Sequence, residues 1–191
     1  VVREITTYCA KIGIKYLTLY AFSTENWKRP KLEVEYLMKL LEKYLKEELE
    51  VYLENNIRFR AIGDLSKFSK SLQNRILKTQ ELTSSCNGLT QVLALNYGSK
   101  DEIIRAIKKL NEKGLEVSEK NLESCLDTAG IPPVDIMIRT SGEVRLSNYL
   151  LWQNAYAEMF FVQTYWPDFT KTELDDIISD FSRRERRFGA V

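Results

Sequence analysis

The chain has 191 residues, a formal net charge of +1 and no histidine. Near-neutral charge excludes the overall positive field typical of nucleic-acid binding, and the length is that of one domain, which we expect to span residues 1–191. The lack of histidine excludes Ser-His-Asp triads and histidine-bound metals, so any chemistry must use carboxylates, amides, hydroxyls, arginines or the substrate's own groups.

The three cysteines, Cys9, Cys86 and Cys125, form no Cys-x-x-Cys pattern. Their odd number and wide spacing argue against a disulfide framework and a zinc site. No apolar run approaches the roughly 18 to 20 residues that span a bilayer, and no signal peptide is visible. We therefore expect a cytoplasmic protein.

Predicted helices and strands alternate from the first residue on. An apolar stripe predicts a helix over Val1–Ile12 that Gly13 closes. The uncharged run Tyr16–Phe22 predicts a buried parallel strand. The elements predicted after it are the helix Leu32–Asn55, the strand Ile57–Ile62, the helix Ser66–Leu82, the strand Leu89–Tyr97, the helices Asp101–Lys113 and Glu119–Ala129, the latter capped by Ser118, the strand Val134–Ile138, the short helix Asn148–Tyr156, the strand Glu158–Val162 and a helix from Thr170 through Phe181. This alternation predicts an α/β fold with a central, mostly parallel sheet flanked by helices.

Three predicted strands end in polar loops, which cover Ser23–Arg29, Asn96–Lys100 and Arg139–Ser147. Because the carboxyl ends of parallel strands share one edge of a sheet, we expect these loops to meet over a common cleft. Arginines in the loops suit the oxygens of a phosphate, since the guanidinium fork binds them in pairs. Helix capping and surface ion pairs, such as Arg145 with Glu143, are the competing interpretation.

A magnesium ion is expected with a diphosphate in such a cleft, because Mg²⁺ typically uses one or two carboxylates plus substrate phosphates. Glu158 and Glu25 are the candidate ligands, although each alone is more typical of an exposed carboxylate than of a metal ligand. No GxxxxGK[ST] or GxGxxG motif is present, which disfavours a nucleotide. The leucine-rich face of the long helix is typical of a core and also suits the wall of a lipid-sized cavity.

Three segments of the chain, TLYAFSTENWKRP, IRTSGEVRLSNYLLWQNAYAEMFFVQTYWPDF and RRERRFG, strongly resemble the cis-prenyltransferases. The resemblance covers essentially the whole chain. It implies a homodimer with a hydrophobic tunnel between sheet and helices, and the Mg²⁺-dependent condensation of isopentenyl diphosphate onto an allylic diphosphate, usually farnesyl diphosphate, with new cis double bonds. The implied product is a long-chain polyprenyl diphosphate such as undecaprenyl diphosphate, the lipid carrier for cell-wall glycans, made in peripheral contact with the inner face of the membrane.

The resemblance also implies roles for individual residues. Asn26 matches the family's proton acceptor, and Glu158 matches the Mg²⁺-associated glutamate. Because an amide is a poor base, the alternative role for Asn26 is to orient a water or diphosphate oxygen that accepts the proton. The tunnel wall is expected at Leu37, Leu40, Leu41 and Leu45. The matching substrate-binding positions are Ser23, Thr24, Glu25, Trp27, Arg29, Arg139, Arg145, Leu146, Ser147, Arg187 and Gly189. Of these, Arg139, Arg145 and Ser147 match the isopentenyl diphosphate headgroup site, and Arg187 with Gly189 matches a C-terminal arm that reaches the partner's substrate.

The sequence also departs from the family pattern. The family's Asp-Gly-Asn-x-Arg phosphate loop, which precedes the first helix, is absent from this sequence, so the resemblance implies that a chain starting at Val1 is inactive by itself. Val144 stands where some relatives have histidine, and Ser99-Lys100 replaces Gly-Arg. Two rival functions are a non-catalytic partner subunit of a prenyltransferase, which the retained polar loops disfavour, and a phosphate- or nucleotide-binding module without chemistry.

Overall fold

Five strands, all paired in parallel, form two sheets in residues 1–185, the part of the chain that this computed structural model describes. Strands β1 (Tyr16–Ser23), β2 (Arg58–Ile62) and β3 (Thr90–Tyr97) form one sheet in the order β1-β3-β2. Strands β4 (Ile136–Arg139) and β5 (Glu158–Phe161) form the other. The chain divides into one unit of residues 9–131 and a second of residues 1–8 with 132–191. The predicted α/β class with parallel strands is confirmed.

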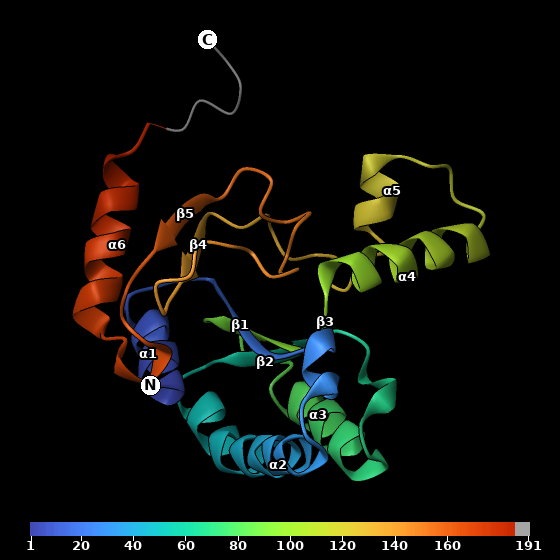
Figure 1. The fold of residues 1–191 in the computed structure, drawn as a ribbon, viewed down its shortest axis with the longest axis horizontal. Helices are drawn as coiled ribbons and strands as arrows, with labels where there is room; N and C mark the ends of the chain where they lie inside the picture. Colours follow the sequence, from blue (N-terminus) through green and yellow to red (C-terminus); the bar gives the residue numbers. More distant parts are fainter. Residues whose placement is uncertain (186–191) are drawn as a thin grey trace. The chain divides into compact units, whose positions relative to one another are not determined.

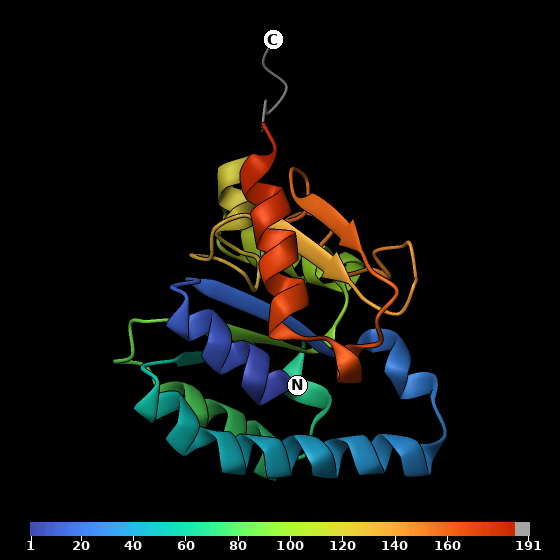
Figure 2. The ribbon, with the colours of Figure 1, turned by 90° about the vertical axis from the view of Figure 1, so that its left-hand side faces the viewer.

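The first unit is built on β3, the central strand of its sheet. Its residues from Gln91 onward are buried because β1 and β2 cover its edges and other elements cover its faces. Helices α2 (Lys31–Glu54) and α3 (Lys70–Leu82) lie together on one face of this sheet, as Figures 1 and 2 show. Helices α4 (Ser99–Glu112) and α5 (Glu119–Glu123) pack against each other.

The long helix α2 buries only part of its leucine-rich face. Leu45 is 1% exposed and Leu41 is buried, whereas Leu37 is half-buried and Leu40 is 48% exposed. Leu41 and Leu45 lie one turn apart with Glu48 and Tyr52 continuing the buried stripe, so this part of the face points into the protein. A tunnel lined by the four leucines stays a prediction.

The second unit combines the β4-β5 sheet with the first residues of the chain and helix α6 (Lys171–Arg183). Helix α6 lies beside the two strands (Figures 1 and 2). The first residues of α1 (Val2–Lys11) join α6 through polar contacts, since the Tyr8 hydroxyl donates to the Asp175 carboxylate at 2.6 Å and Lys171 Nζ lies 3.0 Å from Glu4. A short 3₁₀ turn, η3 (Trp166–Asp168), precedes α6.

Two helices of the structure are shorter than the sequence predicts. The helix predicted over Ser66–Leu82 is divided at Phe68 into the 3₁₀ turn η2 (Leu65–Lys67) and α3, because Ser69 caps a new start by accepting the Leu72 N–H at 3.2 Å. The helix predicted over Glu119–Ala129 ends at Glu123, although Ser118 caps its start as expected.

The prediction of a helix over Asn148–Tyr156 is wrong. The segment forms successive turns, because Ser147, Asn148 and Leu150 adopt positive φ values of 49°, 60° and 46°. A right-handed helix cannot continue through such residues. The strand Tyr16–Phe22 was expected to be buried, yet β1 lies at the edge of its sheet and Tyr16 is 40% exposed.

All three cysteines are buried free thiols. Burial raises the pKa of Cys9 to about 11, which keeps it protonated at neutral pH. Within residues 1–185, no helix combines the length and apolar character needed to cross a membrane.

Candidate active site

The loop after β1 forms a compact 3₁₀ turn, η1 (Thr24–Lys28). The pairing of β1 with β3 shifts between Tyr20 and Phe22 and again before Ser23, a bulge of the kind that redirects a strand end. The Asn26 side chain closes the turn, because its Oδ1 accepts the Ser23 N–H at 2.8 Å. The predicted catalytic residue therefore also acts as a cap, and its amide NH₂ is the group that can donate outward.

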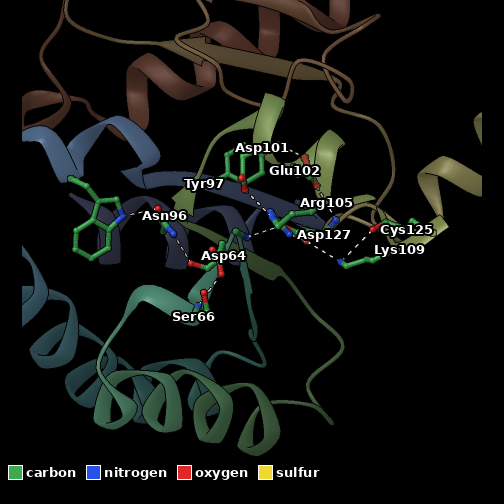
Figure 3. Close-up of polar contacts among 12 residues, drawn as sticks. Asp64, Ser66, Asn96, Tyr97, Asp101, Glu102, Arg105, Lys109, Cys125 and Asp127 are labelled. Atoms are coloured by element: carbon green, nitrogen blue, oxygen red, sulfur yellow. Dashed lines mark hydrogen bonds and ion pairs between the residues drawn. The ribbon is translucent and has the colours of Figure 1, made fainter. Parts of the chain in front are cut away.

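Trp27 is anchored inside the same unit by both its ring and its N–H group. The indole lies 5.0 Å from the Phe22 ring and 5.8 Å from the Phe68 ring, measured between centroids. Its Nε1–H donates to Asn96 Oδ1 at 2.7 Å (Figure 3). Because that N–H is used within the protein, a substrate contact of Trp27 would use the face or edge of the ring.

The loops after β1 and β3 meet as expected, since these strands are parallel neighbours and Ser23 lies opposite Tyr97. Arg29, just after η1, pairs with Glu33 at 2.7 Å, and both side chains are about half exposed. Thr24 is half-buried and Glu25 is exposed. The outer part of this loop can therefore contact a ligand, while its inner part is fixed.

A partly buried ion-pair cluster supports this edge of the sheet, and the sequence did not reveal it. Asp127 accepts hydrogen bonds from the Arg105 guanidinium at 2.7 and 2.5 Å, and from the Gly63 N–H at 3.0 Å (Figure 3). Arg105 also binds Asp101 at 2.8 Å, and Lys109 Nζ lies 3.5 Å from Asp127. Asp127 was not identified from the sequence, because it was predicted to lie in the helix Glu119–Ala129 and not in a loop at the end of a strand.

The ionisation of Asp127 follows from two opposing effects. Burial raises the pKa of its carboxyl, but the hydrogen bonds and charge of Arg105 outweigh burial and hold the pKa below its usual range. Glu102, which is fully buried, accepts the Asp127 N–H at 2.9 Å and the Tyr97 hydroxyl at 2.5 Å. The cluster thus ties α4 to the ends of β2 and β3.

The loop after β4, in the second unit, carries the predicted headgroup residues. Arg139 ends the strand, and its carbonyl accepts the Val162 N–H at 2.9 Å. Ser141 and Gly142 follow with positive φ values of 72° and 67°, and their N–H groups donate to Thr164 and Val162. This backbone turns sharply, as a strand-end loop that presents side chains must.

Arg145 in that loop forms an ion pair with Glu143, the competing interpretation made from the sequence. The pair leaves the Arg145 side chain 60% exposed, so a diphosphate could compete for it. Leu146 is half-buried and Ser147 is exposed. Among residues 1–185, no carboxylate forms an ion pair with Arg139.

Glu158, the predicted metal ligand, begins β5 and binds Arg184, with 2.7 Å between Oε2 and the guanidinium. Arg184 also pairs with Asp180 and lies 4.3 Å from the centre of the Phe160 ring. No group of three or more Asp, Glu, Cys or His side chains in the described chain could hold a metal alone. A single carboxylate fits Mg²⁺ only where a substrate supplies the remaining ligands, as a diphosphate does.

The structure therefore brings the first set of predicted residues together on one loop and most of the second set on another, whereas Glu158 lies apart at the start of β5, opposite Ile136 at the amino end of β4. Arg187 and Gly189 lie outside the described residues. The predicted meeting of the two sets over one cleft stays a prediction. The set on the η1 loop is Ser23, Thr24, Glu25, Asn26, Trp27 and Arg29, and the set in the second unit is Arg139, Arg145, Leu146, Ser147 and Glu158.

Parallel strands with amide- and arginine-bearing loops at their carboxyl ends define an α/β protein with candidate sites at its sheet edges. The family model described as putative undecaprenyl diphosphate synthase matches residues 1–189. The chain belongs to this prenyltransferase family.

Named relatives and solved structures agree with that assignment. The chain is 64% identical to an isoprenyl transferase of Wolinella succinogenes and 56% identical to one of Helicobacter pylori, covering 100% and 99% of this chain and 83% of each relative. A probable undecaprenyl diphosphate synthase from Campylobacter jejuni matches with a TM-score of 0.92 at 46% identity, over 98% of this chain and 89% of that one. A lavandulyl diphosphate synthase from Lavandula x intermedia, solved with dimethylallyl diphosphate, matches with a TM-score of 0.93 at 34% identity, over 98% and 84%.

Proposed function

We propose that this prenyltransferase condenses isopentenyl diphosphate onto an allylic diphosphate, preferably farnesyl diphosphate, and forms cis double bonds. The product is a long-chain polyprenyl diphosphate such as undecaprenyl diphosphate, the lipid carrier for cell-wall glycans. The observation that carries the proposal is the likeness over nearly the whole chain to a synthase solved with an allylic diphosphate. The likeness to a probable undecaprenyl diphosphate synthase favours the long product.

The arginines after β4 would hold the isopentenyl diphosphate headgroup. Arg139, at the end of its strand, presents a fork of donors that matches phosphate oxygens in pairs. Arg145 would exchange its exposed partner Glu143 for the diphosphate, which carries more charge than one carboxylate. Ser147 would add a neutral hydroxyl donor from the same loop.

Asn26 would orient the acceptor of the proton that is lost when the new double bond forms. Its Oδ1 already accepts the Ser23 N–H, and an amide is a weak base in any case, so direct proton abstraction by Asn26 is disfavoured. Its NH₂ group can instead donate to a water or diphosphate oxygen and fix that atom near the reacting carbon. The side chain thereby contributes geometry rather than basicity.

Mg²⁺ is the proposed cofactor, with Glu158 as its protein ligand among the described residues. Bound with the diphosphate, it would neutralise the charge that develops on the leaving oxygens. Glu158 has one oxygen engaged by Arg184, which holds the carboxylate in place and would share it with the metal. We also propose a homodimer and peripheral contact with the membrane that receives the lipid product.

The test is a prenyl-transfer assay on the full natural protein. Radiolabelled isopentenyl diphosphate, farnesyl diphosphate and Mg²⁺ are incubated with it, and the products are dephosphorylated and separated by length. We expect labelled long-chain polyprenols that disappear when Mg²⁺ is chelated. No incorporation of label, together with tight binding of a nucleotide, would support a binding module without chemistry instead.

A further inference from the structure

Asn96 uses both ends of its side-chain amide to join two loops. Its Oδ1 accepts the Trp27 indole N–H at 2.7 Å, and its Nδ2 donates to the Asp64 carbonyl at 2.6 Å (Figure 3). The residue is 1% exposed, so water does not compete for these bonds. The amide therefore works as a bridge between η1 and the loop that follows β2.

The backbone of Asn96 is adapted to this bridge. Its φ of 48° lies in the left-handed region, which asparagine tolerates better than most residues. Its carbonyl accepts the Asp64 N–H at 3.3 Å, which adds a second link to the same loop. Backbone and side chain thus both fix Asn96 at the end of β3.

The loop on the far side of the bridge is itself held firmly. Gly63 has a φ of 109°, and a Cβ there would lie 2.0 Å from the Leu95 carbonyl oxygen, so β2 and β3 approach as closely as a glycine permits. The Gly63 N–H donates to Asp127, which Arg105 holds by two hydrogen bonds. Asn96 is therefore anchored to the ion-pair cluster on α4.

On the η1 side of the bridge, Asn96 binds Trp27, the residue next to Asn26. The Phe22 and Phe68 rings restrict the plane of the Trp27 indole, and the hydrogen bond to Asn96 fixes its direction within that plane. Trp27 and Asn26 are neighbours in the five-residue turn η1, so a shift of Trp27 moves Asn26 with it. Small displacements of a group that orients reactants are costly to catalysis.

We infer that Asn96 is a positioning residue, which acts through Trp27 to hold the η1 turn and the Asn26 amide in the geometry required for prenyl transfer. The inference rests on the proposed function. The competing possibility is a purely structural bond, which satisfies two buried polar groups and affects folding alone. The two roles predict different results in protein that is still folded. Loss of the hydrogen bond lowers kcat if Asn96 is a positioning residue and leaves kcat unchanged if the bond is purely structural.

The experiment compares Trp27→Phe, Asn96→Gly and the double variant in the full natural protein. Phenylalanine retains an aromatic ring without the N–H donor, and glycine accepts the positive φ without the amide. We expect each single variant to lower kcat on the order of 10- to 100-fold, with KM for both substrates within about threefold. The double variant should be no slower than Asn96→Gly, because both changes remove the same hydrogen bond.

Asn56→Gly is the matched control. Asn56 also has a positive φ, 53°, and its side chain also makes two hydrogen bonds, both with Asn87, but it precedes β2 at the opposite end of the strand. We expect Asn56→Gly to leave kcat within about twofold. Circular dichroism and thermal unfolding of every variant establish that the assays measure folded protein.

The outcomes separate the two proposals. If the wild type transfers prenyl groups and Trp27→Phe, folded, keeps kcat within about twofold, Asn96 is only structural and the proposed function stands. The inference would also be overturned if the reduction of kcat in the double variant equalled the product of the reductions in the two single variants, because the residues would then act independently. Lack of prenyl transfer by the wild type overturns the proposed function and the inference together.

Discussion

The loops after β1 and β4 carry similar polar residues and are built in opposite ways. The η1 loop uses its polar groups inward, with Asn26 capping the turn and Trp27 bound to Asn96. The β4 loop directs Arg145 outward, since its side chain is 60% exposed and, within residues 1–185, pairs with a neighbour on the same loop, Glu143. An amide that orients a reacting atom must be held still, whereas a long arginine side chain can adjust to a charged headgroup.

The largest effect that this contrast predicts is on substrate capture at the β4 loop. Arg139→Ala should raise KM for isopentenyl diphosphate on the order of 100-fold and KM for the allylic diphosphate less than about threefold, since a bidentate charged contact contributes about 2 to 3 kcal/mol. Steady-state kinetics with each substrate varied in turn measure the difference. Arg139→Lys, which keeps the charge without the fork, should lie between. Equal rises in both KM values would mean that Arg139 is not in the headgroup site.

The next effect concerns the support of the η1 loop. Asp127→Asn should lower the free energy of unfolding by about 2 to 3 kcal/mol at pH 7, because the partly buried Arg105 loses its main partner. Urea unfolding measures this change. Asp101→Asn removes the more exposed partner of the same arginine and should cost less than about 1 kcal/mol. Equal losses for the two variants would show that burial of the Asp127 pair is unimportant.

The same residue predicts a pH dependence. The pKa of Asp127 is lower in the folded protein than its usual 3.8, so its stabilisation is present above that value and is lost as pH falls through the folded pKa. The difference in stability between the wild type and Asp127→Asn should therefore shrink below about pH 4. Urea titrations between pH 3 and pH 7 test this; a difference that grows on acidification would reverse the assigned sign.

A smaller effect is expected at the proposed metal ligand. Glu158→Gln should raise the Mg²⁺ concentration for half-maximal activity about tenfold, because a neutral amide oxygen is a weaker ligand for a hard cation than a carboxylate. Mg²⁺ titration of the initial rate measures it. Glu143→Gln neutralises a carboxylate that is paired with Arg145 and should leave the Mg²⁺ requirement unchanged. An unaltered requirement in Glu158→Gln would leave Glu158 as a partner of Arg184 alone.

The smallest effect concerns α2, which follows η1 directly. Leu45→Trp should shift products to shorter chains if the buried face of the helix lines the tunnel, while Leu40→Trp, at a position 48% exposed, should not. Separation of dephosphorylated products by length measures both. A normal fold with unchanged product length in Leu45→Trp would place Leu45 in the ordinary core.

The sequence predicted the strands well because their signal is local. Each predicted strand lies within two residues of an observed one, and the run Tyr16–Phe22, which is β-branched, aromatic and uncharged, coincides with β1 to within one residue. The capping of η1 by Asn26 was also foreseeable, since polar residues after a strand commonly cap the next turn. These features depend on neighbours in the chain, which a single sequence displays.

Features that depend on distant residues were missed. The turns after Ser147 look amphipathic in sequence, and only the positive φ values of Asn148 and Leu150 show that no helix forms. Asp127 and Asn96 gained their roles from partners 22 and 69 residues away in the chain. A pattern read along the chain does not contain such contacts, so the network that supports Asn26 became visible only in three dimensions.

The burial of Cys9, Cys86 and Cys125 makes the chain suitable for selective labelling. Thiol reagents attack exposed thiolates, so the folded protein should give little background reaction. A cysteine introduced at the exposed Lys28 on η1, and another at Val144 in the β4 loop, would accept a pair of spectroscopic probes. The signal between the probes would then follow both loops as each diphosphate substrate is added.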